Sequence, residues 1–475
     1  MKQFKILGVA LAAAMVVACG GSDDNATVAP PPVKFTSMVS FGDSLSDVGT
    51  YKVGAVAALG GGTYTINGVT GVLGSSPTPS KNWTELIAAR IGVAAPCPAQ
   101  TGLNSGAALG GPVAVVDFPT CRNYAQGGAR VTDPVGPGSA SAPVNSALGQ
   151  LTVPVVTQIS NHLSRVGSFS GTELVTVLVG ANDVFRLLDT LVANATAAGS
   201  AAGSQAFVTS LTGQLAADAT AANAPATISG AFVQAKTAGA SDLNAVTAAF
   251  QAAAAAGSAK ALAALTKAGG GDTSDILAVV GIATTAANTA GAAAGAEYAR
   301  TRGGAEAVFP MGEAGKQLAS YIKTQIVGKG AKYVAVVNLP DASSTPSAKA
   351  QSADTQALIL NMVIYFNELL ASELAGTPGV HIVDAFADLR NQIANPASYG
   401  LSNVSTPACN LNAPANGLAD AAKPQSGTSL VCNTSNVIAG DVSRYLFADT
   451  VHPTPYGYKL LADLVDKNLT QAGWR

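Results

Sequence analysis

Residues 35–45 read FTSMVSFGDSL, and this stretch decides the fold that the sequence predicts. Its first seven residues form a short, nearly continuous apolar run, which is typical of a strand buried on both faces of a sheet. Similar runs occur later, and segments with apolar residues at helical spacing lie among them. The later runs are 173–179, 332–339 and 380–384, and the helical segments are 81–91, 314–327 and 356–374. Strands that alternate with helices predict an α/β fold with a parallel sheet.

One alanine-rich stretch does not follow this alternation. Residues 191–300 contain 41 alanines in 110 positions, with scattered Gly, Thr and Asn. Alanine favours helix and glycine interrupts it, so we expect a helical insertion inside the α/β domain. Residues 276–296 carry no charge, but Ala, Thr and Gly dominate them, which favours a packed helix over a transmembrane one.

The overall composition excludes several classes of protein. Only 11% of the 475 residues are charged, and 26 basic against 28 acidic residues leave a net charge of −2. Such a chain has no basic field that could hold nucleic acid. Sparse charge with 48% hydrophobic residues also argues against a disordered chain. The length allows one large domain or two ordinary ones.

The N-terminus has the pattern of an export signal. Two lysines precede an apolar run over residues 6–17, which is too short to span a membrane as a mature helix. The run ends in VACG, with Cys19 as the cysteine, and this resembles the lipobox of bacterial lipoproteins. The resemblance implies cleavage before Cys19 and stable anchoring through its acyl chains. Gly20 favours an outer-membrane destination by the same analogy. The alternative is a secreted protein whose Cys19 is discarded with the signal.

These features predict the division of the chain into segments. We expect a lipoprotein signal peptide at 1–18, a flexible tether at 19–34 and a single α/β domain at 35–475, with the helical insertion at about 191–300.

The four remaining cysteines are Cys97, Cys121, Cys409 and Cys432. An even number in an exported protein indicates two disulfides, and three connectivities are open. The local pairs, Cys97 with Cys121 and Cys409 with Cys432, are the simplest. The sequence contains no CxxC or HExxH motif, so a structural zinc site or a metalloprotease has little support.

Ser44 directly follows the first predicted strand, where α/β sheets place their ligands. A serine hydroxyl needs a base to become a nucleophile. The chain has three histidines, and His452 stands three residues after Asp449. That carboxylate could fold back in one turn and orient the ring, as a Ser-His-Asp triad requires. His162 lies in a polar stretch and His381 in a predicted strand, so we expect structural or surface roles for both.

Four sequence blocks together resemble the GDSL family of SGNH hydrolases, and they occur in the family's order. The blocks are GDSL at 42–45, NYAQGGA at 123–129, GAND at 180–183 and DTVH at 449–452. The resemblance implies a three-layer α/β/α, flavodoxin-like fold, for which we expect about five parallel strands.

The same resemblance implies a role for each matching residue. Ser44 would be the nucleophile, His452 the general base and then acid, and Asp449 the group that orients His452. The oxyanion hole would combine the N–H of Ser44, the N–H of Gly127 and the side-chain amide of Asn182. No cofactor or metal is required by this mechanism.

The predicted function is therefore hydrolysis of carboxylic esters through an acyl-serine intermediate. We expect lipid-like or short-to-medium acyl esters as substrates, outside the cytoplasm. A carbohydrate acetylesterase or an acyltransferase could use the same site. A non-catalytic surface-binding lipoprotein is a different class, and the complete set of site residues argues against it.

Overall fold

The computed structural model describes four stretches of the chain, residues 32–68, 80–105, 110–412 and 428–475. The predicted signal peptide, Cys19 and most of the predicted tether lie outside the described residues.

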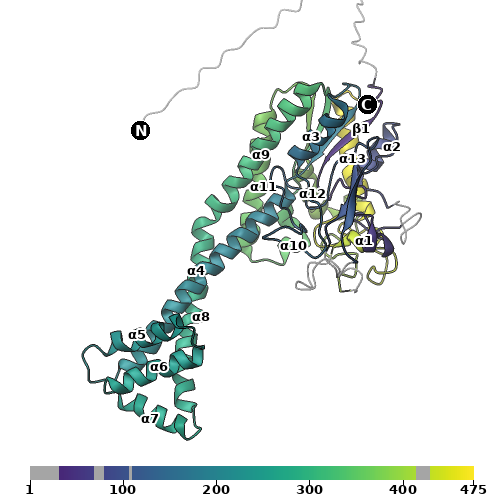
Figure 1. Cartoon of the computed structure of the whole chain (residues 1–475). Coiled ribbons are helices and arrows are strands. Elements are labelled where there is room, and N and C mark those ends of the chain that lie inside the picture. Colours follow the sequence, from purple (N-terminus) through teal and green to yellow (C-terminus); the bar gives the residue numbers. More distant parts are fainter. Residues whose placement is uncertain (1–31, 69–79, 106–109, 413–427) are drawn as a thin grey trace, which may run out of the picture.

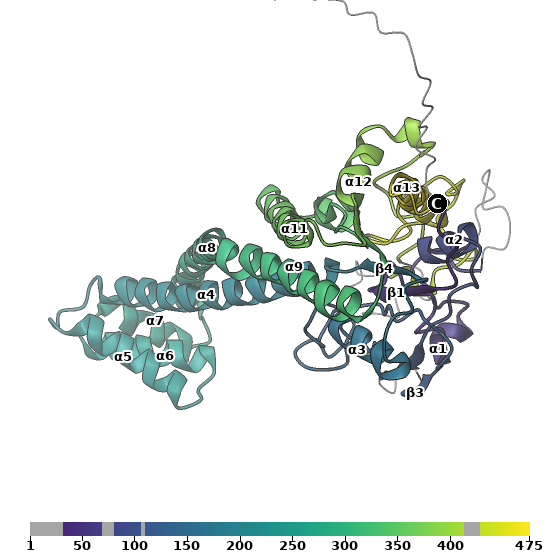
Figure 2. The same ribbon diagram turned by 90° about the horizontal axis from the view of Figure 1, so that it is seen from above.

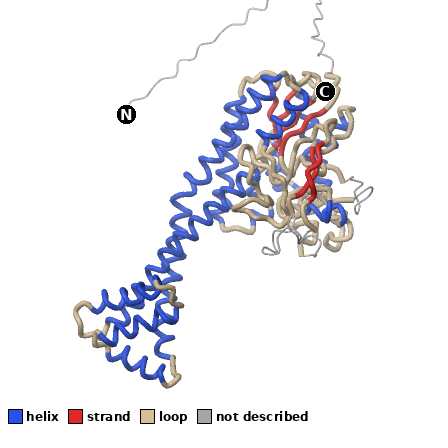
Figure 3. Tube along the Cα trace, in the orientation of Figure 1, coloured by secondary structure: helices blue, strands red, loops and turns tan. Residues whose placement is uncertain are grey.

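A parallel sheet forms the centre of the α/β domain (Figure 3). Its strand order is β1 (Met38–Gly42), β4 (Leu174–Leu178), β5 (Tyr333–Val337) and β6 (Val380–Val383). All residues of β1 and β4 are buried. Helices cover both faces of the sheet, and this explains why the strand sequences are continuously apolar. The predicted parallel sheet is confirmed.

The described residues form four strands of this sheet, where about five are expected. A fifth segment runs beside the free edge of β1. Ser40 N donates to the carbonyl of Arg122 at 3.0 Å, and Ser40 O accepts from the N–H of Tyr124 at 2.8 Å. The N–H of Gln126 donates to the carbonyl of Gly42 at 3.1 Å, but the only parallel bridge to β1 in the described part of this segment pairs Ser40 with Asn123, and the chain turns at Gly128 (φ +79°). The expected strand is thus reduced to a short edge segment.

Helices form a layer on each face of the sheet. One face packs against α3 (Val155–Val166), α9 (Phe309–Tyr321) and α11 (Ala353–Leu374), and the other against α2 (Trp83–Arg90) and α13 (Pro455–Gln471). The three-layer architecture is therefore confirmed. The other elements of this domain are α1 (Gly54–Ala58), α10 (Pro346–Lys349), α12 (Ala385–Ala394) and an antiparallel pair, β2 (Gln100–Leu103) with β3 (Val113–Asp117).

The alanine-rich stretch belongs to a helical arm that projects from the α/β domain (Figures 1 and 2). Helix α4 (Ala181–Ala216) leads outward and α8 (Ser274–Gly303) returns beside it. The 36 residues of α4 make it about 54 Å long. The far end of the arm carries three shorter helices, α5 (Ala224–Thr237), α6 (Asp242–Ala255) and α7 (Ala259–Gly269), which share a separate hydrophobic core with the outer ends of α4 and α8.

Small residues let α4 and α8 approach closely. A Cβ atom at Gly199 would lie 2.7 Å from the carbonyl oxygen of Gly291, and one at Gly203 would lie 3.0 Å from that of Ala287. By length and composition alone, α11 and the helical run from Ser274 to Lys329 could each cross a membrane. In the structure α11 packs on the sheet, and α8 packs along α4.

Candidate active site

Ser44 lies just beyond the carboxyl end of β1. Gly42 lets the backbone pass close to β4, because a Cβ atom there would lie 2.3 Å from the carbonyl oxygen of Leu178. The N–H of Asp43 donates to that oxygen at 3.3 Å, and the Asp43 side chain accepts from the N–H of Leu45 at 3.0 Å. The turn is thus fixed on both sides of Ser44. It places the hydroxyl at the sheet edge where parallel α/β folds bind ligands.

His452 reaches Ser44 from the other end of the sequence. Its Nε2 atom lies 2.8 Å from Ser44 Oγ, and its Nδ1 atom lies 2.7 Å from Asp449 Oδ2. The other carboxylate oxygen of Asp449 closes the turn by accepting from the N–H groups of Val451 and His452, at 2.8 and 2.7 Å. Hydroxyl, imidazole and carboxylate form one hydrogen-bonded chain, which is the arrangement that can remove a proton from serine.

The carboxylate of Asp449 is buried, with 1% of its side chain exposed. Burial alone would raise the pKa of Asp449. The charge of His452 and the hydrogen bonds from His452 and Ser429 outweigh burial and lower the pKa to about 2. The Ser429 N–H donates to Asp449 Oδ2 at 2.6 Å. Asp449 is therefore ionised at neutral pH and can stabilise a protonated imidazole.

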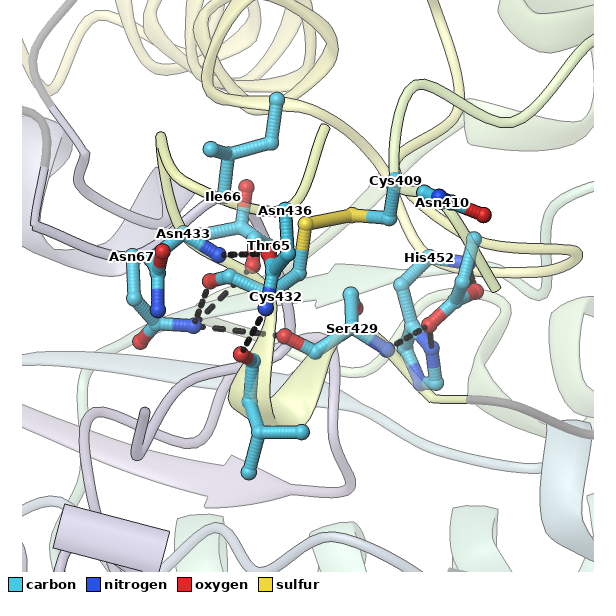
Figure 4. The surroundings of a disulfide bond; sticks show 12 residues. Thr65, Ile66, Asn67, Cys409, Asn410, Ser429, Cys432, Asn433, Asn436 and His452 are labelled. Atoms are coloured by element: carbon cyan, nitrogen blue, oxygen red, sulfur yellow. Dashed lines mark hydrogen bonds and ion pairs between the residues drawn. A yellow bond between two sulfur atoms is a disulfide. The ribbon is translucent and has the colours of Figure 1, made fainter. Parts of the chain in front are cut away.

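A disulfide holds the segment of Ser429 against the turn that ends at His452. The N–H of Cys432 donates to the carbonyl of Ser429 at 2.9 Å, and the N–H of Cys409 donates to the carbonyl of Ala448 at 2.8 Å. The bond between Cys409 and Cys432 joins these two segments, and Figure 4 shows the disulfide close to Ser429 and His452. The disulfide is thus coupled to Asp449 through the hydrogen bond between Cys409 and Ala448, the residue that precedes Asp449.

Both disulfides of the structure join local pairs. Cys97 is bonded to Cys121, and Cys409 is bonded to Cys432. Of the three possible connectivities, this is the simplest. The first disulfide braces the edge segment beside β1, because the N–H of Asn123 donates to the carbonyl of Cys97 at 3.2 Å.

Asn182 stands in the first turn of α4, directly after β4. Its Nδ2 atom donates to the carbonyl of Ala129 at 2.8 Å, which uses one of the two amide protons. The second proton has no hydrogen-bond partner among the described residues. Asn182 lines the same cavity as Ser44, so this proton is available to a substrate oxygen. Its neighbour Asp183 pairs instead with Arg130, at 2.9 Å.

The structure corrects the role expected of Gly127. The N–H of Gly127 donates to Asp47 Oδ2 at 2.9 Å, so it is not free for a substrate. Gly128 lines the cavity, and its N–H has no hydrogen-bond partner in the part of the chain that the structure describes. Gly128 has φ +79°, and a Cβ atom there would lie 2.3 Å from the carbonyl oxygen of Pro137. Gly128 therefore replaces Gly127 as the candidate donor.

Two buried carboxyl groups, those of Asp43 and Asp47, stabilise the turn that carries Ser44. Asp47 accepts from the N–H groups of Gly49 and Thr50, both at 2.8 Å, as well as from Gly127. Burial nevertheless raises the pKa of Asp47 to about 6. Oδ2 of Asp43 is buried without a partner among the described residues, and burial raises the pKa of Asp43 to about 7. Neither carboxyl group lines the cavity, so both act on the backbone.

A cavity with a volume of about 790 Å³ lies at Ser44, and we call it the Ser44 cavity. Gly128, Asn182, Asp449 and His452 also line it. Most other lining side chains are apolar, and they include Leu45, Val144, Leu148, Phe185, Leu339, Leu389, Leu446, Phe447, Val451 and Leu461. A space of this size and character suits an ester with an apolar acyl chain.

Tyr64 belongs to the site, although it lies in none of the four sequence motifs. Its ring centroid lies 4.7 Å from that of His452, and Tyr64 lines the Ser44 cavity. Its hydroxyl is hydrogen-bonded to Gln150 Nε2. Tyr64 thus supports the imidazole from its flat side. No local pattern marks this residue, because its role depends on a contact with a residue almost 400 positions away.

The other two histidines lie outside the Ser44 cavity. The ring centroid of His162 is 4.5 Å from that of Phe169, its Nδ1 atom is 3.3 Å from Tyr124 Oη, and burial lowers the pKa of His162 to about 4. Nε2 of His381 lies 3.0 Å from Asn468 Oδ1. Both contacts are structural. Among the residues described, no group of three or more His, Cys, Asp or Glu side chains is placed to hold a metal ion.

Comparison with known proteins identifies one family. The model of the family described as GDSL-like Lipase/Acylhydrolase matches residues 38–270. The match includes Ser44, Gly128 and Asn182, and it ends in the arm, before Asp449 and His452. No curated protein matches the chain.

Proposed function

The chain belongs to the GDSL-like lipase/acylhydrolase family of ester-hydrolysing enzymes, and we propose that it is a serine esterase acting on carboxylic esters through an acyl-Ser44 intermediate. One observation carries the proposal. Ser44, His452 and Asp449 form a continuous hydrogen-bonded chain, with contacts of 2.8 and 2.7 Å, at the wall of an apolar cavity.

The first half of the reaction acylates the serine. Ser44 Oγ attacks the ester carbonyl carbon while His452 Nε2 takes the hydroxyl proton. Asp449 holds Nδ1–H, so that Nε2 carries the lone pair, and its charge stabilises the imidazolium that forms. The tetrahedral intermediate then collapses. The bond to the alcohol oxygen breaks, and His452 returns its proton to that oxygen.

The negative charge of the tetrahedral intermediate needs donors that are already in place. We assign this role to the N–H groups of Ser44 and Gly128 and to the free amide proton of Asn182. Neither N–H group has a partner among the described residues. Removing one such donor typically costs about 10²–10³ in rate.

The second half of the reaction releases the acid. A water molecule, deprotonated by His452, attacks the acyl carbon, and the bond to Ser44 Oγ breaks. His452 then returns the proton to Ser44, which restores the free enzyme. Every proton is moved by side chains of the chain itself.

The apolar walls of the Ser44 cavity support lipid-like or short-to-medium acyl esters as the substrates. A carbohydrate acetylesterase could use the same site, and the preference for long acyl chains over acetyl distinguishes the two reactions. Transfer of the acyl group to an alcohol would use the same intermediate, and product analysis distinguishes the two reactions.

We further propose that the mature protein is an outer-membrane lipoprotein anchored through Cys19. The support is the signal pattern before Cys19 and the presence of two disulfides, which form in oxidising compartments. In cells, Cys19→Ser should abolish incorporation of labelled fatty acid and move the protein out of the membrane fraction. An unchanged membrane fraction would contradict the anchoring.

Hydrolysis of a 4-nitrophenyl acyl ester series tests the enzymatic proposal. Ser44→Ala should abolish turnover, and the acyl length that is hydrolysed best should exceed acetyl. Ser46→Ala is a matched control, because Ser46 lies in the same buried turn and its hydroxyl has no partner among the described residues. Equal activity of wild type and Ser44→Ala would exclude Ser44 as the nucleophile.

A further inference from the structure

Arg186 has no part in the mechanism above, although it lines the Ser44 cavity. We propose that Arg186 binds an oxyanion group of the substrate, a carboxylate or a phosphate, so that the preferred ester is anionic. The inference rests on the proposed function, since it names the substrate class of the same site.

The position of Arg186 on α4 places it beside the proposed oxyanion hole. Arg186 follows Asn182 by four residues, and residues at this spacing lie on the same face of a helix. Four residues correspond to about 6 Å along the helix axis. Among the lining residues that the structure describes, Arg186 is the one lysine or arginine. A positive group therefore stands on the same helix and in the same cavity as the amide donor Asn182.

The guanidinium of Arg186 is only partly used. Its Nη1 atom contacts Asp189 Oδ2 at 2.9 Å, and the Asp189 side chain is 57% exposed. The Arg186 side chain is only 14% exposed, and its Nε atom is buried without a hydrogen-bond partner. Nη2 also has no partner among the described residues. Buried donors are nearly always paired, so an unpaired one needs an explanation.

The unpaired atoms form a binding edge. Nε–H and one Nη2–H lie in the guanidinium plane and point out from the same edge of it, and together they match two oxygens of a carboxylate or phosphate. Asp189 occupies Nη1, which leaves this edge intact. A neutral ester group could accept one of the two bonds, whereas an oxyanion accepts both and also balances the charge.

The acidic groups of the cavity leave Arg186 available. Asp449 is bonded to His452. Asp388 accepts from Gln392 Nε2 at 2.6 Å and from Tyr399 Oη at 3.3 Å, and burial raises the pKa of Asp388. Asp189 is largely exposed, where solvent and salt screen its charge. None of these carboxylates contacts the Nε–Nη2 edge.

Two matched pairs of esters test the inference. The carboxylate pair is mono-4-nitrophenyl glutarate and 4-nitrophenyl valerate, which have acyl chains of equal length. The phosphate pair is a lysophosphatidic acid and the monoacylglycerol with the same acyl chain. For each pair of esters we measure kcat/KM for wild type, Arg186→Gln and Arg186→Lys. The control is Arg300→Gln, which removes an exposed arginine of the helical arm.

We expect the charged ester to be preferred in at least one of the two pairs. The pair that shows this preference identifies the anion as a carboxylate or a phosphate. Arg186→Gln should lower the ratio of charged to neutral kcat/KM about 10- to 100-fold, in line with the loss of a charge-assisted bidentate contact. Arg186→Lys should restore part of the ratio, and Arg300→Gln should leave it unchanged. A ratio that Arg186→Gln does not alter, in a variant with a wild-type unfolding midpoint, overturns the inference.

Binding separates failure of this inference from failure of the proposed function. Calorimetric titration of Ser44→Ala with the same esters does not require turnover. Tighter binding of the charged ester, lost in Ser44→Ala/Arg186→Gln, supports the anion site even if no ester is hydrolysed. Equal binding of charged and neutral esters refutes the anion site even if hydrolysis by the wild type is established.

Discussion

The substitution Asp449→Asn tests how the imidazole is held. In the structure Oδ1 of Asp449 accepts from two backbone N–H groups, while Oδ2 accepts from the N–H of Ser429 and from Nδ1 of His452. An asparagine that keeps the first pair must turn its NH₂ group toward Ser429 and Nδ1. Nδ1 then has to be the acceptor, so Nε2 carries the proton and cannot remove one from Ser44.

The expected losses can be estimated separately for activity and for stability. With the wrong tautomer, kcat should fall by about 10⁴. The lowering of the Asp449 pKa from 3.8 to about 2 corresponds to about 2 kcal/mol of folding free energy. Because the folded pKa lies below the unfolded one, this stabilisation is present above pH 3.8 and is lost as the pH falls toward 2. The asparagine variant should lack this part of the acid dependence.

The assay combines turnover with unfolding. We would measure kcat on 4-nitrophenyl butyrate, and urea unfolding at neutral pH and at about pH 3. Asp354→Asn, at an exposed position in the first turn of α11, is the control and should keep the wild-type kcat. If folded Asp449→Asn kept more than about a tenth of the wild-type kcat, the tautomer argument would be refuted.

Three further substitutions probe the turn, the buried acid and the arm. Gly128→Ala should lower kcat by about 10²–10³, because a Cβ atom would meet the carbonyl of Pro137 at 2.3 Å and displace the oxyanion donor; unchanged kinetics would remove Gly128 from the site. Asp43→Asn keeps the acceptor for the turn but cannot ionise, and burial raises the pKa of Asp43 from 3.8 to about 7. That raised pKa destabilises the fold as the pH rises from about 4 through 7, so urea unfolding should show the variant more stable than wild type by about 2–4 kcal/mol at pH 8, with no such gain at pH 4. Gly199→Leu should separate α4 from Gly291 of α8 at a cost of about 1–3 kcal/mol, seen as faster proteolysis of the arm with ester hydrolysis retained; an arm as resistant as in wild type would contradict the close packing.

Strands and helices were predictable where the signal is local. Residues 173–179 predict β4 to within one residue at each end, because a strand buried on both faces must be apolar throughout. About five strands were expected, although only four were placed on the sequence, and the fifth position is taken by a short segment beside β1. The course of this segment depends on the turn at Gly128 and on the disulfide between Cys121 and Cys97. Neither can be predicted from the spacing of apolar residues.

The candidate site also combines contacts that the local sequence predicts with contacts that it does not. Asp449 and His452 lie within one turn of chain, so their mutual contact follows from their spacing alone. The choice between Gly127 and Gly128 could not be made from adjacent identical residues. It depends on the carboxylate of Asp47, which takes the N–H of Gly127 across 80 positions of sequence.

The sequence by itself determined the parallel α/β architecture, the helical nature of the alanine-rich stretch and the short turn that carries Asp449 and His452. These are encoded by neighbouring residues, through apolar periodicity and intrinsic propensity. Only the tertiary structure decided which glycine offers a free donor, which cysteines pair, that Tyr64 supports His452, and that one edge of Arg186 is left unpaired. Each of these depends on which hydrogen-bonding groups are already satisfied by partners far away in the chain, and folding alone brings those partners together.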